Sequence, residues 1–291
     1  MVSHHSFGGD WTNDKLLRLK KYLVAYATIM NKQPFRFAFI DAFAGTGYRT
    51  ISPEENELQL AIPELLEPET RTFVDGSARI ALEVKPRFSK YIFIERNANK
   101  IVELEALRNS YPELSKDVSI VNEDANEWLQ DRCRNYDWKK NRAVLFLDPY
   151  GMQVAWNTIE AIAETKAIDL WILFPLGVAV NRLLRRDAQI NPAVRKRLNV
   201  VFGSSGWYRA FYKKTREENL FGEENLTIKN CNFDSIAEYF VNRLSSIFPG
   251  VASNPLLLLN RKNIPLYLLC FAAANVKGAK TAIKIAQEIL E

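Results

Sequence analysis

Apolar residues recur at helical spacing near the start of the chain. Between Trp11 and Met30 they fall at three- and four-residue steps, and Thr12 is a candidate N-cap. This pattern predicts an amphipathic helix, and we assign residues 1–34 to an N-terminal helical segment. A short apolar run at Phe37–Asp41 follows and stops before glycines, which is typical of a buried parallel strand.

Strand-like and helix-like patterns then alternate. Further strand candidates are Tyr91–Glu95, Val118–Asn122, Ala143–Leu147, Asp169–Phe174, Leu256–Leu259 and Leu266–Ala272. Helix patterns lie at Gly76–Val84, Asn97–Asn109, Ala125–Leu129, Trp156–Thr165, Asp234–Phe248 and Gly278–Leu290. The alternation predicts an α/β fold, Rossmann-like and doubly wound, with a mostly parallel seven-stranded sheet.

Two segments interrupt this alternation. Residues 52–70 are rich in Pro and Glu, which predicts an irregular surface insertion after the first strand. Residues 176–233 break the pattern with the basic groups Arg185-Arg186 and Arg195-Lys196-Arg197 and with nearby aromatic residues, and we predict a helical insertion after strand five. The main domain would then span residues 35–291. The basic groups indicate either a solvated helix face or a nucleic-acid surface.

Composition narrows the class of protein. The chain has 291 residues, 47% of them apolar, and a formal net charge of +5. No apolar run approaches the roughly 20 residues of a membrane span, and we expect a cytoplasmic protein without a signal peptide. Cys133, Cys231 and Cys270 are far apart and the two histidines are His4 and His5, so no metal site is expected. The basic surplus suits a polyanionic partner without requiring one.

The first candidate strand runs into a glycine turn, Asp41-Ala-Phe-Ala-Gly-Thr-Gly47. Glycine lets a backbone approach a ligand closely. A dinucleotide-binding turn carries a third glycine and opens a helix, and a phosphate-binding loop carries Gly-Lys-Ser/Thr; neither pattern is present. S-adenosylmethionine (SAM) has no phosphate, so this turn favours SAM. The candidate cofactor-binding residues here are Asp41, Phe43, Ala44, Gly45, Thr46 and Gly47.

Carboxylates also end the second and third strand candidates. Glu95 can accept hydrogen bonds from both ribose hydroxyls of an adenosine, or it can cap the helix that begins near Asn97. Asp124 can accept from an adenine amino group, or serve as an N-cap, and the two roles are compatible. With their neighbours Arg96 and Ala125, these residues complete the predicted cofactor site.

The fourth strand candidate ends in Asp148-Pro149-Tyr150-Gly151. Proline stiffens this loop, Tyr150 can stack on a planar group, and Asp148 can accept protons from an exocyclic amine or contact the cofactor. We therefore predict that Asp148, Pro149 and Tyr150 form the reaction centre. A strand-ending turn without chemistry is the other interpretation of this loop.

Taken together, several segments resemble the three-Cys-motif partner family. The matching segments are Phe7–Thr12 with Lys15-Leu16, Phe39–Gly47, Tyr91–Glu95, Phe146–Gly151 and Phe174–Leu184. That family looks like a class I, Rossmann-type methyltransferase, and it is named after a neighbouring radical-SAM-like iron-sulfur protein that bears three cysteines. The resemblance implies SAM as the cofactor and that three-Cys-motif protein as a partner.

The leading hypothesis is methyl transfer from SAM, with nucleic acid as the favoured acceptor class. Asp148-Pro-Tyr is similar to the acidic-Pro-aromatic loops of amino-group methyltransferases, although those loops place the aromatic one position later, after a second proline. The alternative is a noncatalytic SAM-binding accessory subunit of the three-Cys-motif protein, which would dock on the basic insertion. A protein that binds NAD or ATP is a third reading, and the missing third glycine and lysine count against it.

Overall fold

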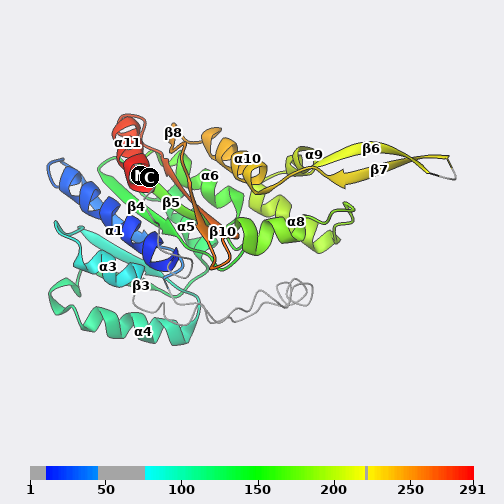
Figure 1. Cartoon of the computed structure of the whole chain (residues 1–291). Helices are drawn as coiled ribbons and strands as arrows, with labels where there is room; N and C mark the ends of the chain where they lie inside the picture. Colours follow the sequence, from blue (N-terminus) through cyan, green and yellow to red (C-terminus); the bar gives the residue numbers. More distant parts are fainter. Residues whose placement is uncertain (1–10, 45–75, 220–221) are drawn as a thin grey trace.

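The structure is a computed structural model that describes residues 11–44, 76–219 and 222–291. Within them, the central sheet has eight strands in the order β3-β2-β1-β4-β5-β10-β8, and β9 also pairs with β10 (Figure 1). β1 to β5 are mutually parallel, and β10 is antiparallel to β5, β8 and β9. The strands are β1 (Arg36–Asp41), β2 (Lys90–Ile94), β3 (Val118–Val121), β4 (Asn141–Leu147), β5 (Ile168–Phe174), β8 (Gly250–Val251), β9 (Leu256–Leu259) and β10 (Pro265–Ala273).

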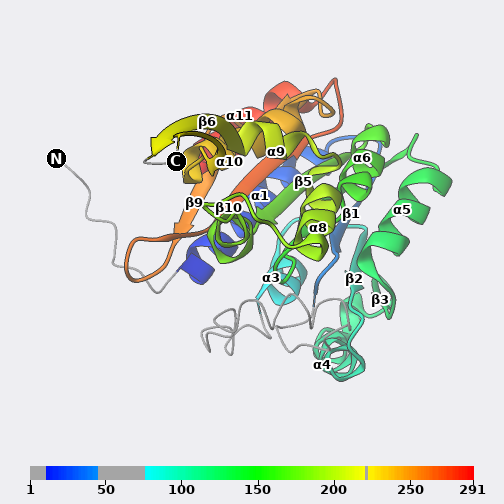
Figure 2. The same ribbon diagram turned by 90° about the vertical axis from the view of Figure 1, so that its right-hand side faces the viewer.

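Helices cover both faces of this sheet (Figures 1 and 2). One face packs against α5 (Ala125–Asn135), α6 (Trp156–Glu164), α8 (Pro192–Phe202) and α10 (Phe233–Ser245). The other packs against α1 (Trp11–Met30), α3 (Ser77–Glu83), α4 (Ala98–Asn109) and α11 (Ala279–Leu290). Because side chains alternate along a strand, Phe39 and Ile40 of β1 enter opposite layers of the core. The predicted doubly wound, mostly parallel α/β fold is confirmed.

The strand order reverses direction between β1 and β4. From β1 the chain adds β2 and then β3 on one side, and it returns to place β4 and then β5 on the other side. In such sheets, ligands bind in the crevice at the carboxyl ends of the strands, at the point where the order reverses. The topology therefore directs attention to the ends of β1 and β4.

Most predicted element bounds agree with the structure to within a few residues, although α5 runs to Asn135 and not to the predicted Leu129, and two further features differ. The sheet has eight strands rather than seven, because β8 is only two residues long and leaves no sequence pattern. The insertion after β5 is helical only in its first part, which holds a π-helix (Leu176–Val180), α7 (Asn181–Leu183), α8 and α9 (Gly206–Phe211). Its second part is an antiparallel hairpin of β6 (Tyr212–Asn219) and β7 (Gly222–Lys229). The predicted irregular insertion at 52–70 lies outside the described residues.

The N-terminal helix α1 belongs to the same core as the sheet. Tyr22 is buried and its hydroxyl donates a 2.7 Å hydrogen bond to Oδ2 of Asp169 on β5. The Tyr22 ring also lies 5.3 Å from the ring of Trp171 and 4.9 Å from that of Phe271, between ring centroids. Burial raises the pKa of Asp169 to about 6, and the Tyr22 hydrogen bond opposes this rise. A buried polar contact therefore fixes α1 across β5.

No helix in the described ranges is long and apolar enough to cross a membrane.

Replacing Tyr22 by Phe tests this contact. The folded-state pKa of Asp169 lies above the ordinary value of 3.8, so this carboxyl makes stability fall as pH rises from about 4 to about 6. Without the hydroxyl, that pKa rises further and the fall extends to higher pH. We expect Tyr22→Phe to lower the free energy of unfolding by about 1–3 kcal/mol near pH 7.5 and by less near pH 5.

Urea unfolding followed by circular dichroism at both pH values measures this difference. Tyr26→Phe is the matched control, because Tyr26 lies one turn further along α1 and is also buried. Equal losses of stability at the two pH values in Tyr22→Phe would contradict the assignment.

Candidate functional site

Four carboxylates lie at the carboxyl ends of four neighbouring strands. Asp41 ends β1, and Glu95, Asp124 and Asp148 follow β2, β3 and β4. The register pairs Asp41 with Phe146, two residues before Asp148. The structure therefore brings the acidic members of the predicted cofactor site and the predicted reaction centre to one edge of the sheet, where the strand order reverses.

Asp41 is fully buried and supports the start of the glycine turn. Its carboxylate accepts hydrogen bonds from the backbone N–H of Phe43 at 3.3 Å and from Oγ of Ser77 at 2.5 Å. The backbone N–H of Ala44 donates to the carbonyl of Ile94 at 3.1 Å, which ties the turn to β2. Phe43 and Ala44 are partly buried beside it. The other predicted members of the turn, Gly45, Thr46 and Gly47, lie outside the described residues.

The electrostatic surroundings of Asp41 oppose its ionisation. Burial is the largest cause and raises the pKa of Asp41 to about 7. The hydrogen bond from Ser77 is the next largest cause and lowers this pKa. The charge of Asp148 raises it, whereas the N–H of Phe43 and the charge of Lys15 lower it. Asp41 therefore titrates near neutral pH. The N–H of Phe43 and the hydroxyl of Ser77 donate hydrogen bonds to its carboxylate and hold this side chain in its buried position. Its observed role is to shape the turn.

Asp148 forms an ion pair with Lys15, a residue of α1 that is 133 positions earlier in the chain. The Lys15 side chain is 2% exposed, whereas that of Asp148 is 23% exposed. The Lys15 ammonium also lies 5.4 Å from the ring centroid of Trp11 and 5.8 Å from that of Phe146. A buried ammonium requires a counter-charge, so the ion pair fixes the Asp148 carboxylate at the tip of β4.

Aromatic side chains surround this ion pair. Tyr267 lies close enough to Asp148 and to Tyr150 to interact with both electrostatically, and its pKa is raised by burial, by the charge of Asp148 and by that of Tyr150. The rings of Trp11 and Tyr267 are 5.2 Å apart. Because β10 is antiparallel to β5, its first residues lie at the same edge of the sheet as the ends of β4 and β5. Trp11, Tyr150 and Tyr267 are all partly exposed.

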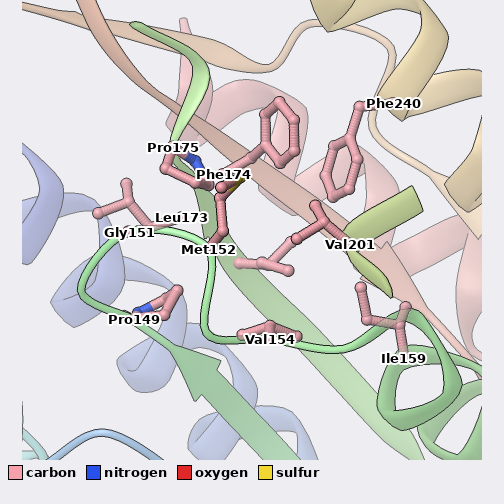
Figure 3. Close-up of a pocket in the computed structure, with 11 residues that line it drawn as sticks. Pro149, Gly151, Met152, Val154, Ile159, Leu173, Phe174, Pro175, Val201 and Phe240 are labelled. Carbon is pink, nitrogen blue, oxygen red and sulfur yellow. The ribbon is translucent and has the colours of Figure 1, made fainter. Parts of the chain in front are cut away.

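The loop after β4 is held by polar and apolar contacts. The N–H of Tyr150 donates to Oε1 of Gln153 at 3.0 Å, and Gly151 adopts a left-handed φ of +67°, which favours glycine. Pro149 and Met152 line a small apolar pocket beneath the loop with residues of β5, α6, α8 and α10 (Figure 3). This pocket encloses about 10 Å³, enough for roughly one water-sized sphere. The side chains that line the pocket pack the loop against the sheet and helices, and the pocket has no room for a nucleoside.

Glu95 and Asp124 both make the capping contacts that the sequence left open. Oε1 of Glu95 accepts from the N–H of Asn97 at 2.7 Å, before α4. Oδ1 of Asp124 accepts from the N–H groups of Asn126 at 2.9 Å and Glu127 at 3.2 Å, at the start of α5. Asp124 keeps 35% of its side chain exposed, and Arg96 reaches it at 3.9 Å. Ala125, the first residue of α5, is buried. Capping is therefore observed, and the cofactor roles stay predictions.

Sequence reasoning did not assign roles at the site to Lys15, Trp11, Tyr267 and Ser77. One signal was present, because Lys15 lies four residues before Leu19 on the stripe of α1 that is otherwise apolar. A lysine on a buried stripe needs a partner, but the pattern cannot say which. Tyr267 left no signal, because the direction and neighbours of β10 are tertiary information.

The aromatic residues near the basic groups of the insertion are mainly core residues. Trp207, Phe211 and Tyr212 are buried, and only Tyr208 of this group is partly exposed, beneath the guanidinium of Arg195 at 4.6 Å. These buried rings offer no faces on which bases could stack. The aromatic residues of the insertion therefore do not support a nucleic-acid surface. Within the described ranges, no group of three or more His, Cys, Asp or Glu side chains is placed to hold a metal ion.

Comparisons with known proteins identify no family. No family model matches the chain, and no curated protein matches it. Similar solved structures include protein LPL1258 of Legionella pneumophila, with 15% identity, a TM-score of 0.39, and coverage of 84% of this chain and 94% of that one. Another is the magnesium protoporphyrin IX methyltransferase of Synechocystis with bound SAM, with 11% identity, a TM-score of 0.30, and coverage of 79% and 87%. Similarities this low identify neither an activity nor the three-Cys-motif partner family.

A pH series on Asp41→Asn tests the buried carboxyl at the turn. The folded-state pKa of about 7 lies above the ordinary value of 3.8, so wild-type stability falls as pH rises through this range, and the Asn variant lacks that fall. We expect the stability of Asp41→Asn relative to wild type to increase by at least about 1 kcal/mol between about pH 5 and pH 8.

Thermal or urea unfolding measures this change. Asp187→Asn is the control, because Asp187 is exposed and its Arg185 partner lowers its pKa to about 2, below the tested range. Parallel pH profiles for Asp41→Asn and wild type would show that Asp41 is not a neutral-range titrating group.

Proposed function

We propose that this chain is a SAM-dependent methyltransferase whose reaction centre is the Asp148-Pro149-Tyr150 loop and whose acceptor is a nucleic acid. The observation that carries the proposal is the arrangement of Asp41, Glu95, Asp124 and Asp148 at the carboxyl ends of β1, β2, β3 and β4. Each strand of the crevice thus contributes one carboxylate.

The donor set of SAM fits these acceptors. SAM carries hydrogen-bond donors on its ribose, its adenine amino group and its ammonium group, and the end of each of these strands bears a carboxylate. In our proposal, Glu95 accepts from the ribose and Asp124 from the adenine amino group, while Asp41 holds the turn from within. When bound, SAM supplies an electrophilic methyl group on a sulfonium, so the protein's contribution is mainly positioning.

Lys15 has a positioning role in this account. Its ammonium engages Oδ2 of Asp148, and the other carboxylate oxygen, Oδ1, takes no part in that contact. Oδ1 can therefore accept a hydrogen bond from an N–H of the acceptor and orient the nitrogen lone pair toward the methyl group. Tyr150, together with Trp11 and Tyr267, offers partly exposed aromatic surface around this point.

A planar base suits this environment. Aromatic rings beside a hydrogen-bond acceptor are how enzymes hold an extruded base with an exocyclic amine. The net charge of +5 adds a general attraction for a polyanion. The buried aromatic residues of the insertion contribute nothing to this argument, which therefore rests on the β4 loop and its neighbours.

The alternative is a noncatalytic SAM-binding subunit of the three-Cys-motif, radical-SAM-like protein. The Lys15–Asp148 ion pair gives it some support, because the ammonium already engages one oxygen of the carboxylate that the reaction would use. The two functions differ in whether the isolated chain transfers a methyl group.

Incubation of the chain with radiolabelled SAM and total cellular RNA, DNA and protein tests the proposal. We expect label in a nucleic-acid fraction, and we expect Asp148→Asn to reduce transfer by about 100-fold or more, a typical loss when a catalytic hydrogen-bonding group is removed. Binding of S-adenosylhomocysteine, measured by calorimetry, should change by less than about threefold, because Asp148 acts on the acceptor.

Two further variants make the result interpretable. Asp148→Asn leaves the Lys15 charge buried, so the double variant with Lys15→Met removes both charges and separates misfolding from lost chemistry. Lys20→Met, an exposed site on α1, is the matched control. Unchanged transfer in folded Asp148→Asn would overturn the assignment of the reaction centre. Cofactor binding without transfer, restored by the three-Cys-motif protein, would establish the accessory function instead.

A further inference from the structure

The hairpin of β6 and β7, residues 212–219 and 222–229, forms an arm that projects from the body of the molecule (Figure 1). It is a separate two-stranded sheet, and within the described residues no third strand pairs with either of its outer edges. Eight residues of strand extend about 26 Å. The arm is therefore long enough to meet another molecule away from the α/β body.

The root of the arm is firmly attached. The Tyr212 hydroxyl donates to the carbonyl of Arg185 at 3.0 Å, and Nζ of Lys229 donates to Oδ1 of Asn181 at 2.7 Å. The N–H of Lys229 also donates to the carbonyl of Arg186 at 3.1 Å. Tyr212 is buried, so the arm leaves the body from a fixed point beside α7 and the residues that follow it.

Beyond the root, the arm is poorly suited to stand alone. Isolated two-stranded ribbons are marginally stable, and the free edge of a strand is a template for pairing with another strand. These features indicate that the arm gains stability from a partner.

The charges along β6 identify the kind of partner. The half next to the root carries Lys213, Lys214 and Arg216, all exposed, and the half next to the tip carries Glu217 and Glu218. A polyanion attracted to the first half would be repelled by the second. A strand with the opposite order of charges fits both halves, and β6 itself, read in the reverse direction, is such a strand on either side of Arg216.

We propose that the arm pairs with the arm of a second copy of this chain, β6 alongside β6, antiparallel about a two-fold axis near Arg216. With Arg216 on the axis, Lys214 of each strand stands opposite Glu218 of the other and Thr215 opposite Glu217, while Arg216 stands opposite its own copy; a parallel, in-register arrangement would oppose like charges at every charged position. A two-fold interface uses the same surface on both copies, which matches a self-complementary strand. The contact is small for a dimer interface, so the dimer is weak and sensitive to salt.

The oligomeric state of the full chain tests this proposal by sedimentation velocity over a range of protein concentrations. We expect a monomer–dimer equilibrium near 0.05 M salt whose dissociation constant rises by about tenfold or more near 0.5 M salt, because screening weakens exposed charge pairs. A chain that stays monomeric at all concentrations in low salt would overturn the proposal.

Charge reversal adds a sharper test. The root variant carries Lys213→Glu with Lys214→Glu, and the tip variant carries Glu217→Lys with Glu218→Lys. Each variant alone makes β6 repel its own copy, so each should be monomeric. An equal mixture should form a heterodimer, because the acidic strand of one now faces the basic strand of the other.

The double variant Lys277→Glu with Lys280→Glu is the control, because both lysines are exposed near the start of α11 on the body. It should dimerise like wild type. Variants that dimerise as well as wild type, or a mixture that stays monomeric, would overturn the proposal. If the wild-type chain is monomeric and the root variant binds a generic RNA less tightly than wild type does, the arm binds RNA and the proposal is wrong. The measurement involves neither SAM nor an acceptor, so it is independent of the proposed methyl transfer.

Discussion

The ion pair between Lys15 and Asp148 is the interaction on which the candidate site depends. It joins the second turn of α1 to the tip of β4, and the Lys15 side chain is 2% exposed. A buried charge without its partner costs several kcal/mol, so α1 must lie across the sheet for the loop after β4 to keep its position. The hydrogen bond between Tyr22 and Asp169, two turns further along α1, fixes the same helix over β5.

The second constraint is the parallel sheet. Parallel strands bring their carboxyl ends to one edge, and the reversal of order between β1 and β4 opens a crevice there. Residues as far apart in sequence as Asp41 and Asp148 become neighbours because the register of β1 and β4 pairs Asp41 with Phe146. The chemistry proposed for the site is a consequence of this topology, with one carboxylate at the end of each of four strands.

Much of this could be predicted from the sequence. The apolar runs of β1, β2, β4, β5 and β10 are largely buried on both faces and therefore stand out as strands, the edge strand β3 is shorter and only partly buried, and Asp41, Glu95, Asp124 and Asp148 could be placed at the strand ends. Lys15 and Tyr267 could not be assigned, because their contacts depend on how α1 and β10 lie on the sheet. The hairpin β6–β7 was predicted as part of a helical insertion, because its highly charged strands lack the apolar alternation that marks a half-buried strand.

The same reasoning explains which inferences changed. The aromatic residues of the insertion looked like a stacking surface in the sequence, but Trp207 and Phe211 are core residues. Aromatic residues near Asp148, which come from α1, the β4 loop and β10, replace them as the candidate surface for an acceptor. The strand β6 is basic near the root of the hairpin and acidic near its tip. The positive net charge of the whole chain therefore does not make the hairpin a basic arm.

A crystal structure of the chain with S-adenosylhomocysteine tests the central claim most directly. The account predicts that the adenosine lies at the carboxyl ends of β1 to β3, with the sulfur facing the Asp148-Pro149-Tyr150 loop and the Lys15–Asp148 ion pair intact. A ligand bound elsewhere, or a sulfur directed away from Asp148, would contradict it.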